Sequence, residues 1–402
     1  MLKSFKFRIF PSSSQSKKID SILSLCRFLY NCALEERISF YSKFKKSRTC
    51  FDQQEFLPEI KELLPEFENI HSQILQDTLK RVDKSYKGFF GRLKTGATPG
   101  FPRFKGYDRY DSFTYPQSGF SFKEGKLNLS KIGLIKIKQH REILGKIKTC
   151  SVIRKNGKYF VCFSCEIPSL APSVLGASPN IIGIDIGIKV FITNSNGDTV
   201  ENPRTLKAHQ EKLAKAQRRF AKIAKLKINR VKRQQHKNHI ARIYETITNV
   251  RNDFLHKTSR KFVDKYGVII LEKLNIQSML SSNRTSLNRN INDCAWKTLT
   301  GMISYKAEDA GKQVIFVNAA GTSQDCSSCG AVVKKDLSER THSCKECGLV
   351  IDRDLNAAKN ILNRGMKILR ENRNIFSKNP ASTGFQEARS FSSGSIHKGI
   401  YC

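Results

Sequence analysis

The chain has 402 residues, which is enough for two or three domains with hydrophobic cores of their own. Its 71 Lys and Arg residues and 35 acidic residues give a net charge of +36, which indicates a polyanionic partner, most commonly nucleic acid. The sequence has no run of about 18 apolar residues and no signal-peptide core at its N-terminus. We therefore expect no membrane partner and a cytoplasmic, nucleoid-associated protein of prokaryotic type.

The first part of the chain is predicted to combine strands with a long helical stretch. Residues 3–10 alternate apolar and basic side chains, as in a half-buried strand, and Pro11 ends the pattern. Apolar residues then recur with helical spacing between residues 15 and 94. A basic loop rich in Gly and Pro covers residues 96–116, and short strands are expected from 120 to 167.

A change of composition follows the predicted linker at residues 171–180. Residues 181–193 read as one nearly continuous buried strand, with a hairpin turn at residues 194–198. Residues 204–242 contain fourteen Lys or Arg residues and one acid, on a helical apolar stripe that fits one helix or a helical hairpin. A solvated surface is the usual role of a charged helix face, but charge of a single sign favours a phosphate-bearing partner here.

Four cysteines further along have the spacing of a metal site. Cys326 and Cys329 form one Cys-x-x-Cys knuckle, and Cys344 and Cys347 form another. Four thiolates in two such knuckles can close a tetrahedral zinc site. His342 lies nearby, but four thiolates already complete a structural site. The remaining eight cysteines show no disulfide framework, as is usual in a reducing compartment.

Two acidic residues occupy predicted strands. Asp185 lies inside a buried strand, where an ionised carboxylate is costly unless a cation neutralises it. Its neighbours Gly183 and Gly187 are expected to leave room for a phosphate. Glu272 ends the apolar run 267–271, at the strand end where open α/β sheets bind ligands.

A third carboxylate lies just beyond the cysteines. Asp354 is expected at the N-cap of a helix, and Asp352 is the alternative candidate for the same role. Three carboxylates from two strands and a helix start can hold two Mg²⁺ ions for phosphodiester hydrolysis. The sequence therefore predicts Asp185, Glu272 and Asp354 as catalytic magnesium ligands.

Several stretches resemble the TnpB (OrfB) family, which insertion sequences encode. The resemblance to its three RuvC motifs and zinc ribbon rests on GIDIGIK at 183–189, LEKLN at 271–275, TSQDCSSCG at 322–330 and DRDLNAAKNI at 352–361. Further similar segments are FRIFP at 7–11, CRFLYN at 26–31, PGFPRFK at 99–105 and NVRNDFLHK at 249–257. The resemblance covers about residues 1 to 362.

This resemblance implies an α+β multidomain fold. An N-terminal β-barrel wedge domain would comprise residues 1–12 and 116–172, with a helical recognition insertion and its basic loop at 13–115. A RuvC (RNase H-like) nuclease domain would comprise residues 180–321 and 348–364, with the zinc ribbon inserted at 322–347. The tail at 365–402 is expected to be disordered because apolar residues are sparse there.

The resemblance also implies an activity, namely RNA-guided, Mg²⁺-dependent cleavage of DNA that supports maintenance of a transposable element. The expected partners are a transposon-derived guide RNA and double-stranded target DNA with an adjacent motif, and functionally a transposase encoded by the element. The expected cofactors are structural Zn²⁺ and catalytic Mg²⁺, and no small-molecule substrate is expected. An RNA-guided repressor without cleavage is one alternative. A transposase that acts directly in strand transfer is another, although its acids would follow the order Asp, Asp, Glu.

Nucleic-acid contacts are predicted by region rather than by motif. Polar residues of a recognition helix and of the strand after the basic loop could read base edges, with packing or capping as the alternative role; they are Ser72, Gln73, Gln76, Thr114 and Tyr115. The basic residues expected on phosphates are Arg103, Lys105, Arg218, Arg219, Lys222, Arg230 and Arg233.

Overall fold

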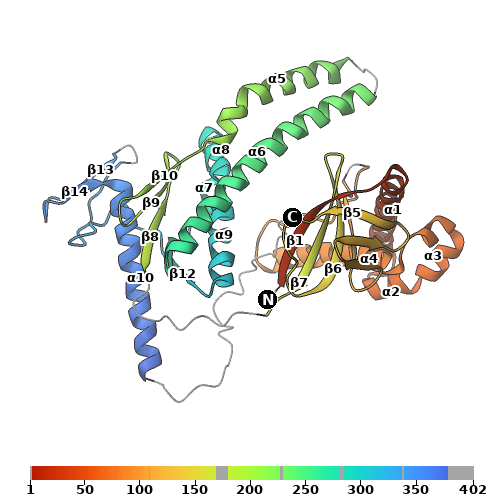
Figure 1. Ribbon diagram of the computed structural model, residues 1–402, viewed down its shortest axis with the longest axis horizontal. Coiled ribbons are helices and arrows are strands. Elements are labelled where there is room, and N and C mark those ends of the chain that lie inside the picture. The colour runs from red at the N-terminus through yellow and green to blue at the C-terminus, as the bar shows by residue number, and fades with distance from the viewer. Residues whose placement is uncertain are drawn as a thin grey trace. The chain divides into compact units, whose positions relative to one another are not determined.

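The computed structural model describes residues 2–107, 109–168, 180–226, 230–280, 285–336 and 339–378. The chain divides into two compact units, and the division falls between residues 168 and 169. Each unit contains its own main sheet and its own hydrophobic clusters (Figure 1).

The first unit is built on a seven-stranded antiparallel sheet with the order β2-β6-β7-β1-β5-β4-β3. Its strands are β1 (Leu2–Phe10), β2 (Ser112–Tyr115), β3 (Phe120–Lys123), β4 (Lys126–Leu129), β5 (Gly133–Lys138), β6 (Lys146–Lys155) and β7 (Lys158–Glu166). Strand β1 lies in the interior of the sheet because it pairs with both β7 and β5. Its predicted alternation is confirmed, since Phe5, Phe7 and Ile9 are buried.

Helices occupy the chain between β1 and β2. They are α1 (Ser13–Phe44), α2 (Cys50–Glu55), α3 (Leu57–Leu63), the 3-10 helix η1 (Pro65–Asn69) and α4 (Ser72–Lys94). Helix α1 starts with a capping box, in which the Ser12 hydroxyl accepts the Gln15 N–H and the Gln15 side chain accepts the Ser12 N–H. One hydrophobic cluster includes side chains from both the helices and the sheet. The strands resume at Ser112, before the domain boundary predicted at residue 116.

The second unit contains a five-stranded sheet with the order β10-β9-β8-β11-β12. The strands are β8 (Ile181–Ile186), β9 (Val190–Asn194), β10 (Thr199–Glu201), β11 (Val268–Glu272) and β12 (Gln313–Val317). Strands β8, β9 and β10 form an antiparallel meander, whereas β11 runs parallel to both β8 and β12. The single strand predicted at residues 181–193 is therefore wrong, because the chain turns back between β8 and β9.

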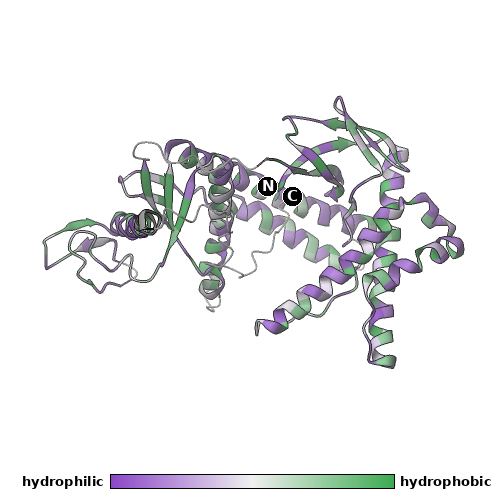
Figure 2. Cartoon of the chain, turned by 90° about the horizontal axis from the view of Figure 1, so that it is seen from below, coloured by the Kyte–Doolittle hydropathy of each residue, from purple (hydrophilic) through white to green (hydrophobic). Residues whose placement is uncertain are grey.

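Helices cover both faces of this sheet. Helices α6 (Arg230–Lys265) and α9 (Trp296–Asp309) pack on the face that carries Ile182 and Leu271. Helix α10 (Arg353–Lys378) packs on the opposite face, against Ile270 (Figure 1). Figure 2 colours much of these strands as hydrophobic, as expected for a sheet that is buried on both faces.

The basic stretch at residues 204–242 forms a helical hairpin, which resolves the choice between one helix and two. Helix α5 (Thr205–Lys225) packs along α6 through Leu213, Ala216, Ile243 and Ile247 (Figure 1). Short helices α7 (Ile276–Leu280) and α8 (Thr285–Cys294) precede α9.

Helix α10 is longer than the sequence suggested. It runs to Lys378, so the disordered tail predicted to begin at residue 365 is wrong for residues 365–378. The helix continues because Ile368 and Leu369 pack against the cluster beneath the sheet. Residues 379–402 and the linker predicted at 171–180, except Asn180, lie outside the described residues. Among the described helices, none is both long and apolar enough to span a membrane.

Candidate catalytic and metal centre

Asp185 and Glu272 lie on neighbouring parallel strands. The register of β8 and β11 pairs Ile184 with Leu271, and each acidic residue is the next one along its strand. Both carboxylates are therefore at the carboxyl ends of parallel strands, where α/β sheets place ligands. Asp185 also pairs with Thr193 of β9 on its other side. The sheet thus brings together two carboxylates that are far apart in the sequence.

Asp354 lies in the first turn of α10, but it is not the helix cap. The Asp352 carboxylate accepts the N–H groups of Asp354, at 2.8 Å, and of Leu355, at 3.1 Å. The predicted N-cap at Asp354 is therefore wrong, and Asp352 has the capping role. The Asp354 carboxylate instead faces Arg340, whose Nη1 lies 3.8 Å from it.

Two glycines explain how α10 comes close to both acidic strands. A Cβ on Gly183 would lie 2.4 Å from the carbonyl oxygen of Ala358, and a Cβ on Gly365 would lie 2.3 Å from Ile270 Cδ1. The prediction that Gly183 leaves room for a phosphate is therefore wrong, because the backbone of α10 fills that space. The space beside Gly187 is filled by the β8–β9 turn, where a Cβ would lie 2.6 Å from the Val190 oxygen.

The three carboxylates interact electrostatically. Burial, reinforced by the charges of Glu272 and Asp354, raises the pKa of Asp185 to about 8. Burial also raises the pKa of Glu272 above its ordinary value, against the opposing effects of Thr322 and Arg364. Burial and then Asp352 raise the pKa of Asp354. Burial is thus the main cause of all three shifts, and at Asp185 the like charges of the other two acids add to it, which a bound cation would relieve.

A layer of side chains that the sequence reasoning did not assign supports Glu272. The buried Thr322 donates its hydroxyl to the Glu272 carboxylate. From α10, Asn360 donates to the carbonyl oxygens of Thr322, at 2.9 Å, and of Asp325. Arg364 donates to the carbonyl oxygens of residues 318 and 320 and pairs with Asp325 at 2.6 Å.

Together with Asn356, which also donates to the Asp325 carbonyl, Asn360 and Arg364 form a row with a spacing of four on α10. That spacing of polar residues on one helix face, 356, 360 and 364, is the signal that could have identified them.

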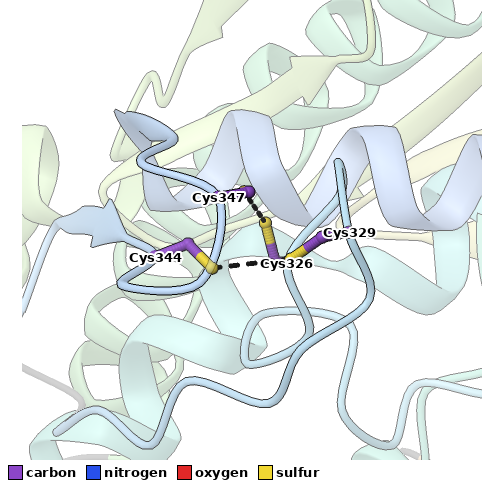
Figure 3. A group of neighbouring side chains, drawn as sticks. All are labelled: Cys326, Cys329, Cys344 and Cys347. Carbon is purple, nitrogen blue, oxygen red and sulfur yellow. Dashed lines mark hydrogen bonds between the residues drawn. The ribbon is translucent and has the colours of Figure 1, made fainter.

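The four cysteines predicted to bind a metal lie together (Figure 3). Their sulfur atoms all lie within 4.8 Å of one another, with Cys326 and Cys347 3.6 Å apart and Cys329 and Cys344 also 3.6 Å apart. Gly330 and Gly348 follow the two knuckles with φ of 80° and 71° and donate their N–H groups to the first cysteine of each knuckle. The predicted assembly of these four cysteines is confirmed.

The protonation of Cys326 also suits metal binding. Burial raises the pKa of this thiol, but hydrogen bonds from the N–H groups of Cys329 and Ser328, with those of His342 and Cys347, outweigh burial and lower it to about 5. At Cys329 the N–H of Ala331 lowers the pKa, but burial and the other three thiols outweigh it and raise the pKa to about 12. A thiolate is the form that ligates a metal. Across the described residues, these cysteines form the one group of three or more His, Cys, Asp or Glu ligand atoms within 4.8 Å. The three carboxylates are not part of such a group, but the charges of Glu272 and Asp354 act on Asp185.

The cysteine loops are tied to the acidic site through α10. Asn356 accepts the N–H of Ser327, which lies inside the first knuckle, at 2.9 Å. The strand β14 (Val350–Asp352), which pairs with β13 (Thr341–Ser343), leads directly into α10. A folded cysteine module therefore fixes both the Asp352 cap and the loop that carries Thr322.

Polar residues predicted to read bases have structural partners in the first unit. The Ser72 hydroxyl accepts from Lys61 at 2.8 Å, and the Gln73 side chain accepts N–H groups of the loop that follows β2. Thr114 accepts from Arg81 at 3.0 Å. Tyr115 is fully buried and donates to the Ser130 carbonyl, so it has the packing role that was the alternative. Gln76 is half-buried.

Most of the predicted basic contacts are accessible. Arg103 is exposed, and the Lys105 ammonium lies over the Tyr30 ring, 5.3 Å from its centroid. Of the contacts predicted on the α5–α6 hairpin, those with exposed side chains are Arg218, Arg219, Lys222 and Arg233. Arg230 opens α6, and its side chain lies outside the described part of the chain.

Comparisons with known proteins agree on one family. A model described as a helix-turn-helix domain of the OrfB IS605 type matches residues 1–46, a probable transposase model matches 173–283, and the Cas12f1-like TNB domain matches 296–361. A putative RNA-guided DNA endonuclease of Streptomyces pristinaespiralis is 31% identical over 372 residues, which is 90% of this chain and 89% of that protein. The chain belongs to the TnpB/OrfB family.

One further relative and one solved structure match the TnpB/OrfB chain over more than nine-tenths of its length. The putative RNA-guided DNA endonuclease InsQ of Escherichia coli K12 is 29% identical, over 92% of this chain and 93% of that protein. A cryo-EM structure of a Cas12f1–sgRNA–target DNA complex matches the fold with a TM-score of 0.58 and 14% identity, over 91% of this chain and 99% of that chain. The residues matched as helix-turn-helix form β1 and the single long helix α1 in this structure.

Proposed function

We propose that this chain is an RNA-guided DNA endonuclease. The observation that carries the proposal is the cluster of Asp185, Glu272 and Asp354, each with a pKa raised by burial, at the carboxyl ends of β8 and β11 and the start of α10. Relatives named as putative RNA-guided DNA endonucleases support the guide and the DNA substrate. Residues 1–168 remain a candidate β-barrel wedge with a helical recognition insertion, and the strand order of the second unit supports an RNase H-like (RuvC) nuclease domain.

The residues present fit Mg²⁺, because carboxylate oxygens are its preferred protein ligands and like charges share one site here. When bound, such ions activate the attacking water and stabilise the leaving oxygen of an in-line displacement. The chain's own contribution is to hold the carboxylates in place. Thr322 fixes Glu272, the Asp352 cap fixes the helix start, and Arg340 faces Asp354.

The four cysteines are proposed to hold one structural Zn²⁺. Four thiolates leave no open position for a substrate, so the role of this site is to fold the segment between β12 and α10. The exposed cations of the α5–α6 hairpin are proposed to neutralise phosphates of the guide RNA and its heteroduplex, whose backbone a guided nuclease recognises. A short motif beside the target, read by the first unit, stays a prediction.

A plasmid assay tests this proposal. The full chain is expressed with RNA from the flank of its own gene, purified, and mixed with a plasmid that carries the matching target in Mg²⁺. Cleavage that requires both the matched RNA and Mg²⁺ supports the nuclease. Tight, guide-dependent binding without any cutting would instead support the repressor, and strand joining without a guide would support a transposase.

A further inference from the structure

An exposed aromatic surface in the first unit has no role in the site described above. Between Lys84 and Tyr107 the sequence has six aromatic residues, six Lys or Arg residues and no acid. Four of these rings contact one another and are called the aromatic platform: Tyr86, Phe89, Phe90 and Phe101. Basic residues interleaved with aromatic ones are typical of surfaces that bind unpaired nucleic acid.

The platform continues the core-facing stripe of α4 beyond the core. Leu75, Leu79 and Val82 are buried on one face of the helix. Tyr86 and Phe90 extend the same helical spacing, but Phe90 is 53% exposed. The rings of Tyr86 and Phe90 are stacked, with centroids 6.3 Å apart.

Phe101, from the loop that follows α4, makes T-shaped contacts with the rings of Tyr86 and Phe89. Its centroid is 5.8 Å from that of Tyr86 and 5.4 Å from that of Phe89, yet Phe101 remains 49% exposed. The Arg37 guanidinium lies 5.6 Å from the Tyr86 centroid. The rings are therefore held by one another while part of their surface is left to solvent.

Two glycines keep the helix backbone beside the rings open. A Cβ on Gly91 would meet nothing within 4 Å, and a Cβ on Gly88 would meet only the end of the Arg92 side chain at 3.6 Å. Glycine inside a helix costs about 1 kcal/mol relative to alanine, and no neighbour in the described chain requires it here. Open backbone lets a flat or extended ligand approach closely.

A cationic hollow adjoins the platform. It has a volume of about 240 Å³ and is lined by three cations, Arg81, Lys105 and Arg109, by one acid, Asp111, and by neutral side chains that include Ser85. Ser85 is the residue directly before Tyr86 of the platform. Rings that can stack on bases thus lie next to cations that can take the phosphates between those bases.

The charge argues against a second copy of this chain as the occupant. In a two-fold interface the same cations would face each other, and Asp83 already pairs with Lys87 and Arg37. Ring faces stack only on unpaired bases, which excludes a closed duplex. Between Lys84 and Tyr107 the neutral hydrogen-bonding side chains are Ser85, Thr95, Thr98 and the two tyrosines, so groups that read base edges or a 2′-hydroxyl are few.

Such a surface tolerates any sequence, which suits a strand whose sequence changes with every target. We propose that the aromatic platform stacks unpaired bases of the DNA strand that is displaced when the guide pairs with its target. This inference rests on the proposed function, because an RNA-guided nuclease opens a duplex and leaves one strand unpaired.

A tryptophan reporter tests the platform in the full chain. The sequence has a single Trp, Trp296, which is 4% exposed, so Phe90→Trp adds a second and accessible one. Its fluorescence is titrated with a fifteen-nucleotide oligo-dT, with an abasic strand of equal length, and with oligo-U. Stacking on one base is worth about 1–3 kcal/mol, so oligo-dT should quench at roughly 5- to 150-fold lower concentration than the abasic strand.

The controls are the unchanged chain and Leu63→Trp. Leu63 is 71% exposed on a segment that carries Glu59, Glu62, Glu66 and Glu68. Neither control should be quenched by oligo-dT. If Phe90→Trp has the same melting temperature as the unchanged chain, the substitution has not disturbed the fold.

Three results would overturn the proposal: equal quenching by the abasic strand, tighter quenching by oligo-U than by oligo-dT, or a dimer in solution that Phe90→Ala converts to a monomer. Plasmid cleavage with no such quenching refutes the platform alone. Quenching in a protein that never cuts DNA leaves the platform standing and refutes the proposed nuclease.

Discussion

Gly183 is the position where one added methyl group tests how the acidic site is assembled. In Gly183→Ala the new Cβ would lie 2.4 Å from the Ala358 oxygen and 2.7 Å from the Leu362 nitrogen. Both are backbone atoms of α10, so no side chain can rotate away. Contacts of real Cβ atoms begin near 3.0 Å, so helix and strand must separate by several tenths of an ångström or more.

Overpacking of this kind costs about 1–3 kcal/mol. One kcal/mol shifts the melting temperature of a unit of roughly this size by about 2–4 °C, so we expect a loss of about 2–12 °C. Because α10 carries Asp354 and β8 carries Asp185, the separation also opens the carboxylate cluster. A misplacement of about 1 Å in an active site can cost about 100-fold in rate.

Calorimetry and plasmid cleavage measure the two effects. Gly301→Ala is the matched control, because Gly301 lies inside α9 and a Cβ there meets nothing within 4 Å. That change should stabilise by about 0.4–1 kcal/mol and leave cleavage unchanged. A Gly183→Ala protein that melts and cuts like the unchanged chain would show that the close packing of α10 on β8 does not position the acids.

Three further predictions concern the groups around the site. Zinc analysis should give one ion per molecule of the purified chain and none in Cys344→Ser. The control is Cys32→Ser, which changes an exposed cysteine outside the cluster and should retain the ion. Equal zinc in both variants would exclude the four-cysteine site. Thr322→Val removes the hydroxyl donated to Glu272 and should slow cleavage roughly 10- to 100-fold, whereas Thr322→Ser should keep most activity; equal rates for both would contradict the positioning role. Because the folded pKa of Asp185 is raised to about 8, the metal-free native state binds more protons than the unfolded chain, so stability in EDTA should fall as pH rises from about 4 to 8. The slope should be smaller in Asp185→Asn, and a slope that stays the same in that variant would assign it to another group.

Periodicity and spacing were sufficient for much of the fold. The alternation of Phe5, Phe7 and Ile9 predicted a half-buried strand, and the register of β1 confirms it. Cysteine spacing predicted the assembled thiols, because two Cys-x-x-Cys knuckles leave few other arrangements. These features depend on local geometry, which the sequence expresses directly.

The errors share a different cause, since each depended on which distant segment fills a given space. Gly183 was assigned to a phosphate, but its open side is occupied by α10, about 175 residues later in the chain. The sequence favours Asp354 over Asp352 both as metal ligand and as N-cap, whereas the hydrogen bonds of the helix start give the capping role to Asp352. Tyr115 follows a basic loop, yet the core of the first unit encloses it.

The support of Glu272 was missed for the same reason. Thr322 lies 50 residues after Glu272, and the two meet because Asn360 and Arg364 hold the intervening loop from α10. A polar row with a spacing of four on an otherwise apolar helix face is a usable signal for such a role. It becomes specific only once the helix is known to cross the sheet.

The central claim is that Asp354, and not its neighbour Asp352, completes a Mg²⁺-dependent cleavage site with Asp185 and Glu272. The most direct measurement compares Asp354→Asn with Asp352→Asn in guided plasmid cleavage, with guide RNA binding and melting temperature recorded for both. We predict that Asp354→Asn abolishes cleavage and retains RNA binding, while Asp352→Asn, which keeps a capping side chain, still cuts. Cleavage that survives in Asp354→Asn would contradict the account.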